Sequence, residues 1–92
     1  MTRIVWTDYM LYRLHGRGFD LATVEHIVRY SSERYTDTAT SRGVAIGRHD
    51  ERLVMIPYER TAEALTPVTI HVTSRQQVDF RVKSGRFTNE YE

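Results

Sequence analysis

The 92-residue sequence contains no cysteine, which excludes a disulfide framework and any metal site built on thiolates. No apolar run approaches the roughly 18 residues needed to cross a membrane, and no signal-peptide core follows the first residue. P-loop, dinucleotide-binding, HExxH and nucleophile-elbow motifs are absent as well. We therefore expect a cytoplasmic protein that has no contact with a membrane and carries none of these catalytic motifs.

Lysine is scarce, although basic residues are not. The 13 basic residues comprise 12 arginines and one lysine, and 12 acidic residues reduce the formal net charge to +1. A planar guanidinium group binds phosphate or carboxylate through two parallel hydrogen bonds, which a lysine ammonium group cannot do. The composition therefore favours a partner that is rich in phosphate or carboxylate groups.

The first third of the sequence has the pattern of two capped helices. Residues 3–6 are β-prone, and we expect a short first strand there. Thr7 and Asp20 are N-cap residues, each followed by apolar residues at helical spacing. The glycines of segment 16–18 separate the two helices, and the second helix is expected to run to about residue 30.

From residue 33 onward the apolar residues alternate or form short runs, which indicates strands. The expected strands cover 34–38, 42–49, 53–56 and 67–73. A loop is expected over 59–66, with Pro57 near a strand end or at a bulge. In the last strand the alternation directs Val68, Ile70 and Val72 toward the core, and His71 with its threonine neighbours away from it.

The C-terminal part of the sequence has the pattern of one more helix. Ser74 and Gln77 form a capping box, and the helix that they open ends near Gly85. We expect residues 87–92 to fray. The elements together predict a single α+β domain over residues 1–92, with a small, twisted, mainly antiparallel sheet of about four to five strands, two N-terminal helices and a short C-terminal helix.

Two groups of basic residues are candidates for anion binding. Arg13 and Arg17 lie four residues apart on the first helix, either as a phosphate clamp or as solvated residues near the C-terminal carbonyl groups. Segment 74–86 carries four basic residues and one acid, a local charge of +3. Within it, the i,i+4 spacing of Arg75, Asp79 and Lys83 is that of a surface salt-bridge ladder. Arg81 and Arg86 fall outside this ladder, and an acidic protein or a nucleic acid would suit them.

A third group of candidate residues lies on the expected sheet. His71 faces away from the core, Tyr58 follows the buried strand, and Arg48 lies near the end of the strand before it. RNA cleavage without a metal needs a base for the 2′-hydroxyl proton, an acid for the 5′-oxygen and a cation for the phosphorane. His71 and Tyr58 are the candidate acid and base, with Arg48 or Arg75 beside the transition-state charge. Alternatively, His71 and Tyr58 are ordinary half-exposed residues of a sheet.

Two segments of the sequence resemble a known bacterial family. Trp6-Thr7, Arg13 and Arg17-Gly18-Phe19 are similar to that family's "T-x-H-A…R…R-G-I" opening. Residues 68–70 and 74–87 resemble its "ITV…TxRQQxxFRxKSGRF" ending. The family consists of very small uncharacterised proteins that are similar to BrnT-type toxins of the RelE/ParE superfamily. The resemblance implies a compact α+β fold, an endoribonuclease activity and an antitoxin encoded next to the gene. The family's opening histidine falls at about Tyr9 or is missing. If that histidine is a general base, this sequence either lacks the base or uses Tyr9 in its place.

We therefore expect a toxin-like component of a toxin–antitoxin pair that cleaves RNA without a metal. Its phosphate-binding residues would be Arg13, Arg17, Arg81, Lys83 and Arg86. Its catalytic residues would be His71, Tyr58, Arg48 and Arg75. No metal and no cofactor are expected, because the four histidines share no ligand spacing. The alternatives are a non-catalytic module of the same fold that binds an acidic protein or a nucleic-acid backbone, and a homodimer that pairs through an exposed strand edge.

Overall fold

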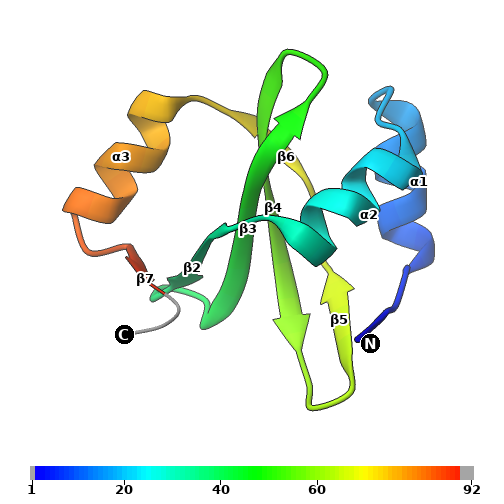
Figure 1. The fold of residues 1–92 in the computed structure, drawn as a ribbon, viewed down its shortest axis with the longest axis horizontal. Helices are drawn as coiled ribbons and strands as arrows, with labels where there is room; N and C mark the ends of the chain where they lie inside the picture. Colours follow the sequence, from blue (N-terminus) through cyan, green and yellow to red (C-terminus); the bar gives the residue numbers. More distant parts are fainter. Residues whose placement is uncertain (1, 90–92) are drawn as a thin grey trace.

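A computed structural model describes residues 2–89, and within this range three helices flank one twisted sheet (Figure 1). The elements in chain order are β1 (Arg3–Ile4), α1 (Asp8–Gly16), α2 (Leu21–Tyr30), β2 (Glu33–Asp37), β3 (Arg42–His49), β4 (Arg52–Arg60), β5 (Ala64–Pro67), β6 (His71–Thr73), α3 (Arg75–Lys83) and β7 (Phe87–Asn89). None of the described helices is long and apolar enough to cross a membrane.

The sheet is almost entirely antiparallel. Its strands follow the order β1-β5-β4-β3-β2-β7, and β6 also pairs with β4. The pair β1–β5 is parallel, and the other pairs are antiparallel. The predicted α+β class and mainly antiparallel sheet are thus confirmed, but the sheet has seven strands over residues 2–89 rather than about four to five.

The helices begin where the N-cap residues predict. The side chain of Thr7 accepts a hydrogen bond from the backbone N–H of Met10, that of Asp20 accepts one from Thr23, and that of Ser74 accepts one from Gln77. These bonds satisfy backbone donors that the first turn of a helix leaves without a partner. The second half of the expected capping box is absent, because the Gln77 amide oxygen accepts from the Thr73 hydroxyl at 3.0 Å instead.

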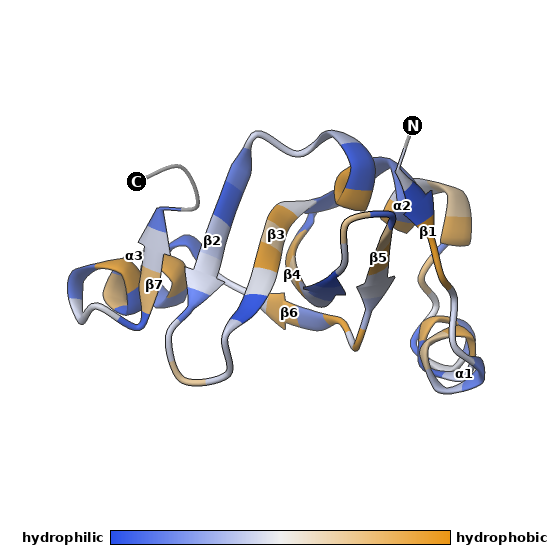
Figure 2. Ribbon diagram, turned by 90° about the horizontal axis from the view of Figure 1, so that it is seen from below, coloured by the Kyte–Doolittle hydropathy of each residue, from blue (hydrophilic) through white to orange (hydrophobic). Residues whose placement is uncertain are grey.

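The central strand β4 is apolar on both faces, as its continuous apolar run predicts. Val54, Ile56 and Tyr58 pack against the core residues of α1 and α2. Leu53 and Met55 point to the other face, where they belong to a second core with Val78 of α3 and Phe87 of β7. The sheet therefore lies between two helical layers, and its hydrophobic centre falls on β3 and β4 (Figure 2).

Two predictions about the middle of the chain are wrong. Strand β4 continues through Pro57 to Arg60, and β5 begins inside the segment 59–66 that was expected to be a loop. Pro57 is tolerated because the partner of β4 changes around it: pairing with β6 ends at Met55 and pairing with β5 begins at Tyr58. The missing N–H of the proline falls in this gap between partner strands, where no ladder bond is lost.

Two further differences concern the strands near the C-terminus. The expected strand 67–73 is split between β5 and β6, and Val72 is 53 % exposed instead of facing the core. Residues 87–89 do not fray but form β7 against β2, with Phe87 stacked on Tyr35 at a ring-centroid distance of 5.5 Å. Burial of this aromatic ring explains why the segment is ordered. The rest of the tail that was expected to fray, residues 90–92, lies outside the described residues.

Gly43 makes room for the ring of Tyr58. The two residues are direct partners across β3 and β4, and a Cβ atom added at Gly43 would lie 2.4 Å from Cζ of Tyr58. The Tyr58 side chain is fully buried, so the ring cannot move outward to solvent. A side chain at position 43 would therefore displace part of the core.

We expect Gly43→Ala to lower the free energy of unfolding by about 1–3 kcal/mol through this overpacking. Gly16→Ala is the matched control, because an added Cβ there meets no atom within 4 Å, and it should raise stability by about 0.5–1 kcal/mol. Urea denaturation followed by circular dichroism measures both values. Equal shifts in the two variants would contradict the predicted clash.

Candidate functional site

His71 lies on the face of the sheet that α3 covers. It is the first residue of β6 and pairs with Met55 of β4, so both side chains are on the same face. Ile70, the preceding residue, is buried in the opposite core with the helices α1 and α2. His71 thus points away from that core, as predicted, and it is half-buried. Strand β6 runs between α1 and α3 in both views (Figures 1 and 2).

The charges of three arginines act on His71. Arg13 belongs to α1, Arg17 is the C-cap residue of α1, and Arg81 belongs to α3. The Arg13 guanidinium contacts the backbone next to His71, because its Nε donates to the Ile70 carbonyl oxygen at 3.5 Å. Its Nη1 donates to the Tyr9 hydroxyl at 3.1 Å. We call His71, Arg13, Arg17 and Arg81 the His71 cluster.

The electrostatics of the His71 cluster favour an anion. Burial lowers the pKa of His71 below its ordinary value of 6.5, and the charges of Arg13, Arg17 and Arg81 lower it further. None of the three arginines forms an ion pair with any residue in the range 2–89. At neutral pH the cluster therefore holds three guanidinium charges around an imidazole that is neutral and able to accept a proton.

Tyr58, the expected catalytic partner of His71, does not share its site. Because β4 continues past Pro57, the alternation places Tyr58 with Val54 and Ile56 on the face that α1 and α2 cover. Its exposure is 0 %, and its hydroxyl accepts hydrogen bonds from Arg34 at 3.3 Å and Arg60 at 3.2 Å. The predicted pairing of His71 with Tyr58 is wrong, since the sheet itself separates the two side chains.

The structure also leaves Arg48 and Lys83 outside the His71 cluster. Arg48 is exposed near the end of β3, where Nη1 donates to the carbonyl oxygen of Glu51 at 3.3 Å. Lys83 is exposed at the last turn of α3. Neither charge contributes to the lowered pKa of His71. Of the residues predicted from the sequence, the fold brings together Arg13, Arg17, Arg81 and His71.

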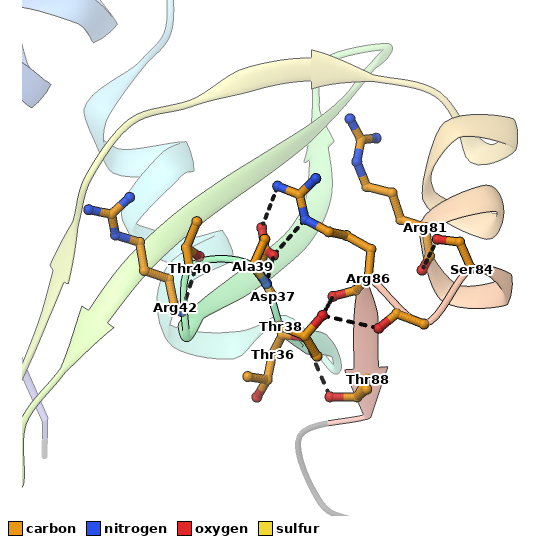
Figure 3. A network of polar contacts seen from close by, with 11 residues as sticks. Thr36, Asp37, Thr38, Ala39, Thr40, Arg42, Arg81, Ser84, Arg86 and Thr88 are labelled. Carbon is orange, nitrogen blue, oxygen red and sulfur yellow. Dashed lines mark hydrogen bonds and ion pairs between the residues drawn. The ribbon is translucent and has the colours of Figure 1, made fainter.

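Arg75 and Arg86 instead tether α3 and β7 to the two ends of β2. Arg75 binds both carboxylate oxygens of Glu33, at 2.7 and 2.9 Å, and also approaches Asp79 at 3.9 Å. The predicted ladder is thus half formed within residues 2–89, because Lys83 forms no ion pair with Asp79. Arg86 binds both oxygens of Asp37, at 2.7 and 3.1 Å (Figure 3). We call these two bidentate ion pairs the β2 tethers. They matter for α3 because Val78 is its one buried residue.

The β2 tethers shift the pKa values of the groups around them. The Arg75 guanidinium holds the pKa of Glu33 below its ordinary value, and the Arg86 guanidinium does the same for Asp37. The Tyr35 hydroxyl donates to Glu33 at 2.6 Å, and burial together with this hydrogen bond raises the pKa of Tyr35 to about 12. Sequence reasoning missed both carboxylate partners, because they lie more than 40 residues from their arginines and no local pattern connects them.

No group of three or more histidine, aspartate or glutamate side chains within residues 2–89 is arranged to hold a metal ion. Comparisons of the chain with protein-family models, with curated proteins and with solved structures found no match. The class that the fold and the site define is an α+β protein with a basic, histidine-containing cluster between two helices. The resemblance to BrnT-type toxins stays a prediction.

The lowered pKa values of Glu33 and Asp37 predict a loss of stability in acid. Both tethers stabilise the fold fully above the unfolded-state values of 4.5 and 3.8, and this contribution disappears as the pH falls through the lower folded-state values. We expect Glu33→Gln with Asp37→Asn to flatten the acid side of the stability curve. Thermal unfolding from pH 6 down to about pH 2 measures this slope. Wild-type and variant curves that run parallel would contradict the prediction.

The surroundings of His71 predict its titration. We expect nuclear magnetic resonance to find the pKa of His71 below 6.5 in the wild type and closer to 6.5 in Arg13→Gln, because one positive charge is removed. The recovery should be partial, since burial is the larger cause. Arg29→Gln is the control, because Arg29 pairs with Glu25 on α2 and does not act on His71. An unchanged pKa in Arg13→Gln would exclude the described arrangement.

Proposed function

We propose that this protein is a toxin-like endoribonuclease that cleaves RNA without a metal ion, and that the His71 cluster is its active site. The observation that carries the proposal is that three arginines, none of which forms an ion pair within the described residues, act on a half-buried histidine, with Arg13 hydrogen-bonded to the carbonyl group of the residue before it. Guanidinium groups bind phosphate, and a neutral imidazole is the base most often used at neutral pH. By contrast, Arg75 and Arg86 form ion pairs with Glu33 and Asp37.

The chemistry would proceed by in-line attack within the RNA strand. The neutral His71 imidazole takes the proton of a 2′-hydroxyl group, whose oxygen attacks the adjacent phosphorus atom. The bond from phosphorus to the 5′-oxygen breaks, and this oxygen receives a proton. The products are a 2′,3′-cyclic phosphate and a free 5′-hydroxyl group. Arg13, Arg17 and Arg81 would stabilise the negative charge that develops on the phosphorane.

Tyr9 is the candidate for the general acid. Its hydroxyl is held by the Arg13 guanidinium at 3.1 Å, which brings it to the border of the His71 cluster. The resemblance to BrnT-type toxins supports an acid–base residue at this position, since the family's opening histidine falls at about Tyr9. The same resemblance makes an antitoxin the proposed protein partner.

A second candidate function is binding without cleavage. The specific observation in its favour is that Tyr58, the second acid–base group expected from the sequence, lies on the other face of the sheet. In this case the three arginines would hold a nucleic-acid backbone or an acidic segment of a partner protein, and His71 would be one of the lining residues.

Cleavage in the presence of a chelator tests the proposal. Purified protein should degrade a labelled RNA in EDTA, with and without ribosomes, and His71→Gln or Arg81→Ala should each lower the rate at least about tenfold. Arg42→Ala is the matched control, since Arg42 pairs with Glu59 at 3.4 Å and should leave the rate unchanged. Full-length RNA after prolonged incubation at micromolar protein, under all of these conditions, would reject the nuclease.

The same preparations separate binding without cleavage from no function on RNA. If RNA stays intact but binds, the logarithm of affinity should fall linearly with the logarithm of salt concentration. Arg81→Ala should then reduce the slope by about 0.7, the value for one phosphate contact on a single strand. Protein that neither cleaves nor binds RNA would reject both RNA functions and leave an acidic protein as the ligand to test.

A further inference from the structure

Helix α1 exposes two tyrosine rings beside the His71 cluster. Tyr9 is 56 % exposed and Tyr12 is 77 % exposed. Tyr12 makes no hydrogen bond or ring contact with any residue in the range 2–89. An exposed aromatic ring beside charged groups of one sign indicates a binding site. It suits a ligand that has an apolar part and carries the opposite charge.

The two tyrosines line a hollow in the surface of α1. Five residues line it: Tyr9, Tyr12, Arg13, Gly16 and Arg17. Its volume is about 230 Å³. Gly16 lies one turn after Tyr12 and has no side chain, and an added Cβ there would meet no atom within 4 Å. The helical spacing therefore places a bare stretch of backbone next to the Tyr12 ring. We call this hollow the α1 hollow.

The α1 hollow and the His71 cluster share two residues. Arg13 and Arg17 line the hollow, and the same two charges lower the pKa of His71. Met10 and Leu14 mark the buried side of α1. Helical spacing places Arg17 and Arg13 nearest to this side and Tyr12 opposite to it. Tyr9 and Gly16 lie between. A ligand held by both arginines would thus have its phosphate toward His71 and its adjoining group toward Tyr12.

We propose that the α1 hollow binds an unpaired nucleobase, which makes single-stranded RNA the substrate class of the His71 cluster. The proposal rests on the function proposed above. Aromatic side chains stack on bases that are splayed out of a strand, and cationic groups beside them bind the flanking phosphates. In a duplex the bases are stacked and paired inside the helix, so no base can reach a ring while its phosphate stays at the arginines.

Binding of a strand that cannot be cleaved tests this subsite apart from the reaction. The probe is a fluorescently labelled 2′-O-methyl oligonucleotide of about ten residues, because its blocked hydroxyl prevents the in-line attack. Fluorescence anisotropy should show that Tyr12→Ala weakens binding about 5- to 150-fold, the range for loss of one stacked base, whereas Tyr12→Trp retains it. Tyr30→Ala is the matched control, because Tyr30 is 64 % exposed on α2 and does not line the α1 hollow.

Two further probes report on the base itself. A strand of the same length without bases should bind the wild type more weakly than the complete strand, and should bind Tyr12→Ala no more weakly than the wild type. A duplex of the same sequence should also be insensitive to Tyr12→Ala. Equal affinity of wild type and Tyr12→Ala for the complete strand, with binding lost in Arg13→Ala, would overturn the subsite and leave the proposed function standing. Failure of every probe to bind the wild type would overturn both.

Discussion

The structure depends on one strand that must be covered on both of its faces. The alternating side chains of β4 are apolar on either side, so the sheet cannot leave one face to solvent as many antiparallel sheets do. Helices α1 and α2 cover one face, and α3 covers the other together with the Phe87 side chain of the edge strand β7. The chain must therefore place helices from its two ends on opposite sides of the same strand, with β6 passing between them (Figure 1).

This arrangement explains why the basic residues of the C-terminal segment have two different roles. Helix α3 buries little apolar surface, and its attachment relies on Val78, on Phe87 of the following strand and on the β2 tethers. The guanidinium groups of Arg75 and Arg86 are therefore engaged in ion pairs that hold α3 on the sheet. Arg81 carries the same formal charge but forms no ion pair in the range 2–89: its guanidinium carbon lies 5.8 Å from the centroid of the Phe87 ring, and its charge acts on His71 of β6. Local charge alone cannot distinguish the two cases.

The helices and their starts were predictable from the sequence because the signals are local. A cap residue and the backbone N–H that it satisfies lie three positions apart, as at Thr7, Asp20 and Ser74. Apart from the half-formed capping box of α3, the wrong predictions involve partners that are distant in the chain. Pro57 reads as a strand end, yet it falls between two partner strands, and the tail over 87–89 is ordered by Tyr35. Tyr58 was expected to act together with His71, and this failed for the same reason, since the direction of the Tyr58 side chain depends on how far β4 continues.

The sequence by itself determined the α+β class, the three helix starts, the apolar central strand and the surplus of arginine. These properties follow from residue spacing and composition, because helix caps and hydrophobic periodicity depend on residues that are close in the sequence. Only the tertiary structure decided which arginines are paired and which surround His71. Ion pairs such as Arg75 with Glu33 join residues 42 positions apart, and the His71 cluster joins α1, β6 and α3. Such contacts are set by the packing of the sheet between its helices, and no local sequence pattern indicates this packing.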